Sequence, residues 1–161
     1  MQSFFARRLP RPKATAIFVA GVGGTVAIAA LLAIGNAVDV ALVIAPFGAS
    51  CVLIFGLPDG PLSQPANVVG GHMVSAVAGM IAISLFPDFW FYPALGVGLA
   101  IAAMAAFRVT HPPAGANPVV IAGLDPGWWF LLVPVLAGTI LLVLCGVLYH
   151  RLTGKQYPAP G

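Results

Sequence analysis

Almost all of the chain between residues 14 and 149 is apolar, and this feature limits the folds that are open to it. The charged side chains in this stretch are Asp39, Asp59, Asp88, Arg108 and Asp125. Hydrophobic residues make up 60% of the 161-residue sequence and charged residues only 7%, whereas soluble domains contain about 25% charged residues. This composition predicts an integral membrane protein.

The apolar stretch divides into six segments. Four of them approach the ~20 residues that a spanning helix needs: 14–35, 66–86, 89–107 and 127–149. The other two are weaker, because 40–57 is interrupted by Pro46 and 113–124 is short. We therefore predict an all-α polytopic membrane protein with four long transmembrane helices and two short segments broken by proline and glycine.

Basic residues flank the apolar region, which is a topology signal and not the signature of a nucleic-acid partner. Before the first segment they are Arg7, Arg8, Arg11 and Lys13, and after the last they are Arg151 and Lys155. The positive-inside rule predicts a basic cytoplasmic segment over 1–13, one transmembrane domain over 14–150 and a cytoplasmic tail over 151–161. The expected location is a bacterial inner (plasma) membrane. A signal peptide over 1–33 is the alternative for the first segment.

The chain also contains an internal repeat. The stretch PFGASCVLIFGLPDG (46–60) aligns without gaps on PAGANPVVIAGLDPG (113–127). Identical residues pair Pro46 with Pro113, Gly48 with Gly115, and Ala49 with Ala116. The flanking helices match as well, so each half (about 14–86 and 89–150) has the order helix, broken short segment, helix. Chance similarity between apolar segments is the alternative to this 3+3 repeat.

The short segments either cross the membrane or dip into it and return. Six crossings place Arg108 on the cytoplasmic side, as the positive-inside rule prefers, whereas four crossings place it outside. Three crossings per half also invert the second half, which gives the inverted repeat found in many transporters. We favour this inverted arrangement.

The prolines of the short segments predict a binding site. Pro46 and Pro113 suit the first turn of a helix, where their missing N–H groups cost nothing. Two such helix starts facing each other would aim free N–H groups and positive dipole ends at a small anion. The small residues Gly48, Ala49, Gly115 and Ala116 would let a ligand touch backbone, and the matched Ser50 and Asn117 can donate hydrogen bonds. A tight structural crossing without a ligand is the alternative.

Further polar residues lie near these starts. His111 can donate to an anion, carry a proton or bond a carbonyl to fix the break, and the last role is favoured. His72 lies inside a predicted helix, where an ionisable residue indicates function, although a neutral imidazole bonded to a carbonyl fits equally well. Asn67 caps its helix or faces the pore. Arg108, with Thr110 beside it, either extends to the lipid headgroups or stands at a pore mouth.

No arrangement of residues typical of an enzyme is found. The sequence has no pair of carboxylates within its apolar segments, no Cys/His cluster with metal-ligand spacing and no phosphate-binding glycine loop. We expect neither a metal nor another cofactor. Cys51 and Cys145 lie in apolar segments and are predicted to be buried thiols.

Three motifs, APFGASCVLIFG, QPANVVGGH and THPPAGANP, occur in an order that resembles the HPP family of integral membrane proteins. The resemblance covers residues 14–150 and departs from the family pattern at Ala66, where many members have a basic residue. Members are usually described with four spans, and members from plastids and cyanobacteria are associated with nitrite transport. The resemblance thus implies nitrite as the first candidate ligand. It assigns the family motifs to Pro46, Gly48, Ala49, Ser50, Gln64, Pro65, Asn67, Gly70, Gly71, His72, His111, Pro112, Pro113, Gly115 and Ala116.

The leading hypothesis is a channel or secondary carrier for a small monovalent anion. It would bind the anion between the starts of the two short helices, with protonation of His72 or His111 as the means of coupling. The alternatives are a pore for a small neutral solute and a non-transporting membrane module. A chain this small rarely encloses a wide path alone, so a homo-oligomer is expected.

Overall fold

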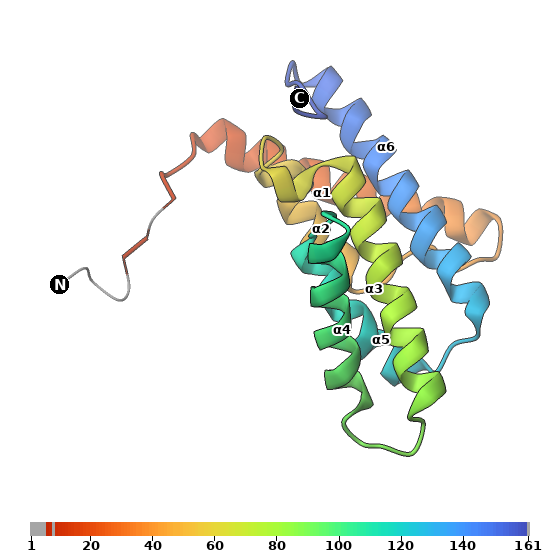
Figure 1. Cartoon of the computed structure of the whole chain (residues 1–161). Helices are drawn as coiled ribbons and strands as arrows, with labels where there is room; N and C mark the ends of the chain where they lie inside the picture. Colours follow the sequence, from red (N-terminus) through yellow and green to blue (C-terminus); the bar gives the residue numbers. More distant parts are fainter. Residues whose placement is uncertain (1–5, 8, 161) are drawn as a thin grey trace.

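All regular secondary structure in the described residues, 6–7 and 9–160, is helical, as the sequence predicts. The computed structural model contains the α-helices α1 (Ala14–Ala37), α2 (Pro46–Gly56), α3 (Pro65–Leu85), α4 (Tyr92–Ala106), α5 (Asn117–Leu124) and α6 (Ala137–Leu152). Short 3-10 or π turns connect them: η1 (Pro61–Ser63), η2 (Pro112–Ala116), η3 (Trp128–Leu131) and η4 (Leu132–Leu136). Figure 1 shows their order along the chain.

Three helical stretches within the described residues are long and apolar enough to cross a membrane. They are Ala14–Ala37, Pro65–Leu85 and Trp128–Leu152. The fourth predicted long helix, over 89–107, is only 15 residues long, from Tyr92 to Ala106. Pro93 lies in its first turn, which is where a helix tolerates a proline, whereas a helix begun at residue 89 would place it further inside. The four long transmembrane helices are therefore not confirmed.

The last segment, predicted as one helix over 127–149, is interrupted. Val133, the second residue of η4, has extended backbone angles (φ −139°, ψ 119°). The next residue is Pro134, and a proline disfavours helical backbone in the residue before it. The helix therefore restarts after the proline and continues to Leu152.

The start of α2 agrees with the prediction, because Pro46 is its first residue. The second short segment divides in two: the 3-10 turn η2 begins at Pro112, and α5 follows from Asn117. Between α4 and η2, Arg108 has the left-handed conformation (φ 59°) two residues after the end of α4. Val109 N–H donates to Met104 O at 2.9 Å, which is the long hydrogen bond of a Schellman motif.

The packing of the helices follows the two halves of the repeat. In the first half α1 packs against α2, and in the second half α4 packs against α5. Between the halves, α3 packs against α4 and α5, while α6 packs against α1 and α2. The two halves therefore correspond pair by pair. If α1, α2 and α3 exchange places with α4, α5 and α6, then α1–α2 becomes α4–α5, α3–α4 becomes α6–α1, and α3–α5 becomes α6–α2. In Figure 1, α3 and α4 lie side by side, and α1 runs across their direction.

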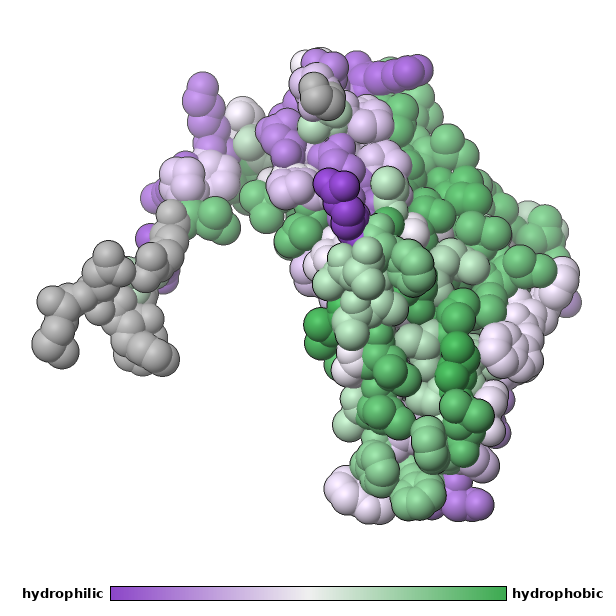
Figure 2. Space-filling model, viewed as in Figure 1, coloured by the Kyte–Doolittle hydropathy of each residue, from purple (hydrophilic) through white to green (hydrophobic). Residues whose placement is uncertain are grey.

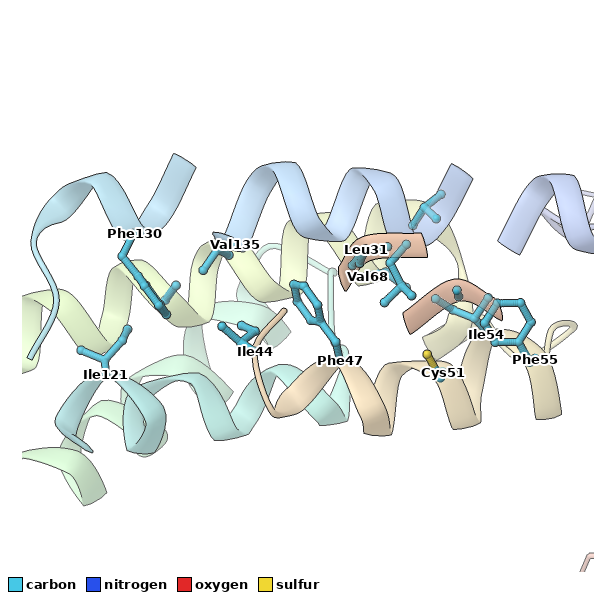
Figure 3. Packing of buried hydrophobic residues seen from close by; sticks show 14 of the residues in the cluster. Leu31, Ile44, Phe47, Cys51, Ile54, Phe55, Val68, Ile121, Phe130 and Val135 are labelled. Atoms are coloured by element: carbon cyan, nitrogen blue, oxygen red, sulfur yellow. The ribbon is translucent and has the colours of Figure 1, made fainter. Parts of the chain in front are cut away.

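The core lies between α2, α3 and the segment from η3 to α6. Phe47, Ile54, Val68 and Val135 are buried there, and Figure 3 shows their side chains pointing between the helices. The outside is also apolar, because hydrophobic residues cover most of the face seen in Figure 2 and hydrophilic ones gather near the two ends of the chain. An apolar outer surface over an all-helical fold fits a lipid environment.

Glycines allow several of these close contacts. A Cβ atom added at Gly138 of α6 would lie 2.5 Å from Leu42 O and 2.5 Å from Cε2 of Phe47. One added at Gly98 of α4 would meet nothing within 4 Å. Gly138 is therefore required for packing, whereas Gly98 is not.

We expect Gly138→Ala to lower the free energy of unfolding by about 1–3 kcal/mol, because α6 must move away from Leu42 and Phe47. Gly98→Ala is the matched control, since alanine favours a helix interior and meets no neighbour. Thermal unfolding of the two variants in detergent measures the difference. Equal melting temperatures would contradict the close approach of α6 to this loop.

Candidate functional site

One face of α3 lies directly against the segment that contains the His-Pro-Pro motif. Small residues recur every four positions on this face, at Gly71, Ser75 and Gly79. Added Cβ atoms at the two glycines would lie 2.6 Å from Cβ of His111 and 2.9 Å from Cα of Pro118, respectively. Between them, the Ser75 hydroxyl donates to the Ala114 carbonyl at 2.6 Å. This small-residue face fixes residues 109–118 along α3.

Three side chains meet where α2 reaches this contact. The hydroxyl oxygen of Ser50, on α2, lies 2.9 Å from Nε2 of His72, on α3, and 2.9 Å from Nε2 of His111. The two imidazole centroids are 5.2 Å apart. Ser50 Oγ is also 3.3 Å from the carbonyl of Pro46, one turn earlier in α2. We call Ser50, His72 and His111 the imidazole cluster.

The outer nitrogen of His72 is held by Asn117, the first residue of α5. The Asn117 amide nitrogen donates to the His72 carbonyl at 2.9 Å, which fixes the orientation of the amide group. Its oxygen, Oδ1, then lies 3.2 Å from Nδ1 of His72. Because an amide oxygen only accepts, Nδ1 carries the hydrogen and donates it.

The outer nitrogen of His111 is fixed in the same way by a backbone carbonyl. Nδ1 of His111 lies 2.8 Å from Leu62 O, so this nitrogen is also protonated and donates. Each neutral imidazole consequently has its hydrogen on Nδ1 and presents an unprotonated Nε2 to Ser50. This tautomer assignment rests on Leu62 O, which can only accept, and on the Asn117 amide, whose orientation is fixed by its hydrogen bond to His72 O.

The imidazole cluster and Asn117 are fully buried, each with 0% exposure. The edge of the Phe47 ring packs on His72, with centroids 5.2 Å apart. Every hydrogen bond described here joins segments that are distant in the sequence, apart from the one to Pro46. The cluster is thus a polar centre that ties α2, α3, α5 and the His-Pro-Pro segment together.

The residues predicted as a site from the sequence fall into three groups. Those buried at or beside the centre are Pro46, Ser50, His72, His111 and Asn117. Those that are half-buried are Asn67, Thr110, Pro113 and Gly115. Those that are exposed on the outside are Gly48, Ala49, Arg108 and Ala116. Asn67 donates to the Thr110 carbonyl at 2.9 Å, which fastens the start of α3 to the His-Pro-Pro segment.

The backbone at the two short-helix starts differs from the expected free N–H groups. Phe47 N–H and Gly48 N–H donate to Ile44 O and Ala45 O, and Ala114 N–H donates to His111 O. Asn117 N–H donates to Ala114 O. These turns satisfy the donors locally, so the groups that converge here are side chains: a hydroxyl, an amide and two imidazoles.

Sequence reasoning gave no role to the far end of α6 and the tail. His150 is 1% exposed and its Nε2 donates to Ile54 O at 2.8 Å. In the tail, the Tyr157 hydroxyl donates to Ser63 O at 2.8 Å, and Ala159 N–H donates to the Gln64 side chain at 2.9 Å. Burial raises the pKa of the Tyr157 hydroxyl to about 12. The aromatic residue in a polar tail was the one sequence signal for this packing.

An all-helical chain with an apolar outside and a buried polar centre is an integral membrane protein of the helical class. Comparison with known families agrees: the model described as "HPP, transmembrane region" matches residues 9–158. The chain therefore belongs to the HPP family of transmembrane proteins.

Two transmembrane proteins of Dictyostelium discoideum are similar in sequence. One is 36% identical over 126 residues, which are 73% of this chain and 44% of that protein. The other is 36% identical over 121 residues, which are 70% of this chain and 39% of that protein. The chain thus spans about two fifths of the length of these relatives. No solved structure matches it.

We expect both His72 and His111 to carry their hydrogen on Nδ1 at high pH, because their outer partners only accept. Nitrogen-15 NMR of histidine-labelled protein in bilayers distinguishes the two tautomers by the shift of each ring nitrogen. A His150→Gln variant leaves these two as the chain's remaining histidines. A signal from an Nε2–H tautomer of either residue would contradict the hydrogen-bond assignment.

Gly71→Ala is expected to displace His111, because the added Cβ would lie 2.6 Å from Cβ of His111 and 2.8 Å from Val109 O. Gly70→Ala is the control, since its nearest neighbour at 2.9 Å is a methyl group of the Val109 side chain. The NMR shift of His111 should change in the first variant and stay close to wild type in the second. Equal effects of the two would show that the approach of α3 is not what positions His111.

Proposed function

We propose that this HPP-family protein transports a small monovalent anion across the membrane, with nitrite as the first candidate. It acts as a channel or secondary carrier and is not an enzyme. The proposed ligand path runs through the two short-segment starts and the imidazole cluster. Its residues are Pro46, Gly48, Ala49, Ser50, Asn67, His72, His111, Pro113, Gly115, Ala116 and Asn117, with Arg108 and Thr110 at the mouth.

The observation that carries this proposal is the meeting of two repeat-matched residues on one imidazole. Ser50 and Asn117 occupy the same position in the two repeats, and they contact opposite nitrogens of His72. Hydroxyl, amide and imidazole groups are costly in an apolar interior and are typical of a path for a polar solute. The starts of the two short helices would therefore flank the ligand, as in transporters built from discontinuous helices.

The exchange of packed helix pairs between the halves supports a 3+3 repeat, which we propose is inverted. In this arrangement both short segments cross the membrane and both chain ends lie in the cytoplasm. Such a repeat gives the two halves two alternative ways of packing around one central site, which is the basis of alternating access. The bacterial inner membrane remains the location that we propose.

We also propose that the protein works as a homo-oligomer. The buried residues of α1 are confined to one stripe, Gly23, Ala27, Leu31 and Gly35. Most other residues of this long helix are exposed or half-buried and apolar, and a mainly apolar groove lies between it and α2. We propose that a second copy covers part of this surface. Cross-linking in the membrane, followed by mass determination, tests the oligomer.

The test of the proposed function is uptake into liposomes that contain the purified full chain under a set membrane potential. Nitrite is compared with nitrate, formate and chloride. We expect nitrite flux to respond to the potential and Gly115→Val to reduce it about tenfold or more, because a side chain would enter the path. A Cβ atom at Gly115 meets nothing within 4 Å, so loss of flux would report obstruction and not misfolding.

Gly123→Val is the matched control, since Gly123 lies on the same short segment and an added Cβ atom also meets nothing within 4 Å. Flux should be close to wild type in this variant. Absence of anion flux above empty liposomes would contradict the proposal. Flux that ignores the potential would instead indicate a pore for a neutral solute.

A further inference from the structure

The hydrogen bonds of the imidazole cluster leave one acceptor without a donor when both histidines are neutral. Each Nδ1–H donates outward, to Asn117 Oδ1 or to Leu62 O. Both Nε2 atoms are therefore acceptors, and both lie 2.9 Å from the same hydroxyl of Ser50. A hydroxyl group has one hydrogen to donate, so it can satisfy one of the two.

One added proton completes the network. The Nε2–H group of one imidazole then donates to Ser50 Oγ, and the Ser50 O–H group donates to Nε2 of the other imidazole. Every polar atom of the three side chains has a partner in this state, which is what buried polar groups require. We propose that Ser50, His72 and His111 form a binding site for a single proton, which the Ser50 hydroxyl passes between the two imidazoles.

The transfer needs no other reactant. The N–H bond of the protonated imidazole breaks, and its proton forms a new O–H bond with Ser50 Oγ. The original O–H bond of Ser50 breaks at the same time, and that proton forms an N–H bond with Nε2 of the second imidazole. The serine ends unchanged, while the positive charge has moved from one ring to the other.

The geometry limits the site to one proton. The ring centroids are 5.2 Å apart and both rings are fully buried. Two imidazolium ions at this separation repel each other strongly, because the interior screens charge far less than water does. The first proton completes the hydrogen bonds, whereas a second would add a like charge.

Other titratable groups on the surrounding elements make contacts elsewhere. On α2, Cys51 faces Gly24 of α1. On α4, Tyr92 donates to Ala122 O. On α6, Tyr149 donates to Val19 O and His150 donates to Ile54 O. In the tail, Tyr157 donates to Ser63 O. Arg108, which follows α4, and Arg151 of α6 are exposed. None of these groups hydrogen-bonds to either imidazole, and Ser50 is the group that joins the two rings.

The proton site has a consequence for transport that rests on the proposed function. With both histidines neutral, the lone pair of one Nε2 atom has no donor, and a free lone pair repels an anion. After one proton has bound, the cluster carries a positive charge that attracts an anion. A proton bound at this site would therefore favour the binding of a monovalent anion beside it.

The test is a pH titration of the full chain in bilayers, followed by nitrogen-15 NMR of the His150→Gln variant. We expect the protonated fractions of His72 and His111 to rise together and to add up to one. Ser50→Ala removes the shared group and should lower the midpoint by about one pH unit or more, a tenfold loss of proton affinity. Ser84→Ala, which removes a serine hydroxyl of α3 that donates to Met80 O of the same helix, should leave the midpoint unchanged.

Three results would overturn the proton site. They are two protons bound at once, no protonation of either ring down to about pH 4, and a midpoint that Ser50→Ala does not move. If Ser50→Ala does not fold, the number of protons bound by the Ser50-containing protein decides the question. Because NMR needs no transported solute, a single titrating proton without nitrite flux would retain the site and reject the proposed function.

Discussion

The close approach of α3 to the His-Pro-Pro segment is the contact on which the rest of the structure depends. Gly71 and Gly79 have no side chain to separate the two, and Ser75 places its hydroxyl against the Ala114 carbonyl. In lipid, where burial of apolar surface gives little drive for helix association, such small residues allow packing and hydrogen bonding to replace it. The approach places His111 beside His72, and Pro118 between Gly79 and Gly96 of α4. This face of α3 therefore docks the His-Pro-Pro segment and α5 of the second half on the first half.

The polar centre follows from that approach and adds a second constraint. An unpaired polar group in an apolar interior costs about 1–3 kcal/mol, so each partner of the imidazole cluster is needed where it lies. Asn117 bonds both the ring and the carbonyl of His72, and Leu62 O holds His111. These partners come from α5 and η1, and Ser50 comes from α2. Both short helices are thereby fixed to His72, α2 through Ser50 and α5 through Asn117.

The sequence predicts much of this arrangement, and the exceptions have physical causes. Proline spacing identified the start of α2, and the repeat alignment identified Ser50 and Asn117 as equivalent residues. The length of α4 was overestimated, because apolar residues before Pro93 continue the hydropathy pattern while the backbone forms turns. The break at Val133 was missed for the same reason. The joining of both imidazoles by Ser50 depends on tertiary contacts over 22 and 61 residues of sequence, which no local pattern encodes.

Charge balance explains why one buried centre would combine a proton site with an anion path. A lone charge in a membrane interior is expensive, whether it is an imidazolium or a bare anion. At an effective dielectric constant of 20, opposite unit charges about 4 Å apart attract each other by about 4 kcal/mol. In the neutral cluster the two Nε2 lone pairs would oppose an anion, and without an anion the protonated cluster would carry an uncompensated charge. Each ion therefore lowers the cost of binding the other at this centre, and the pair of histidines joined by one serine limits the centre to one proton.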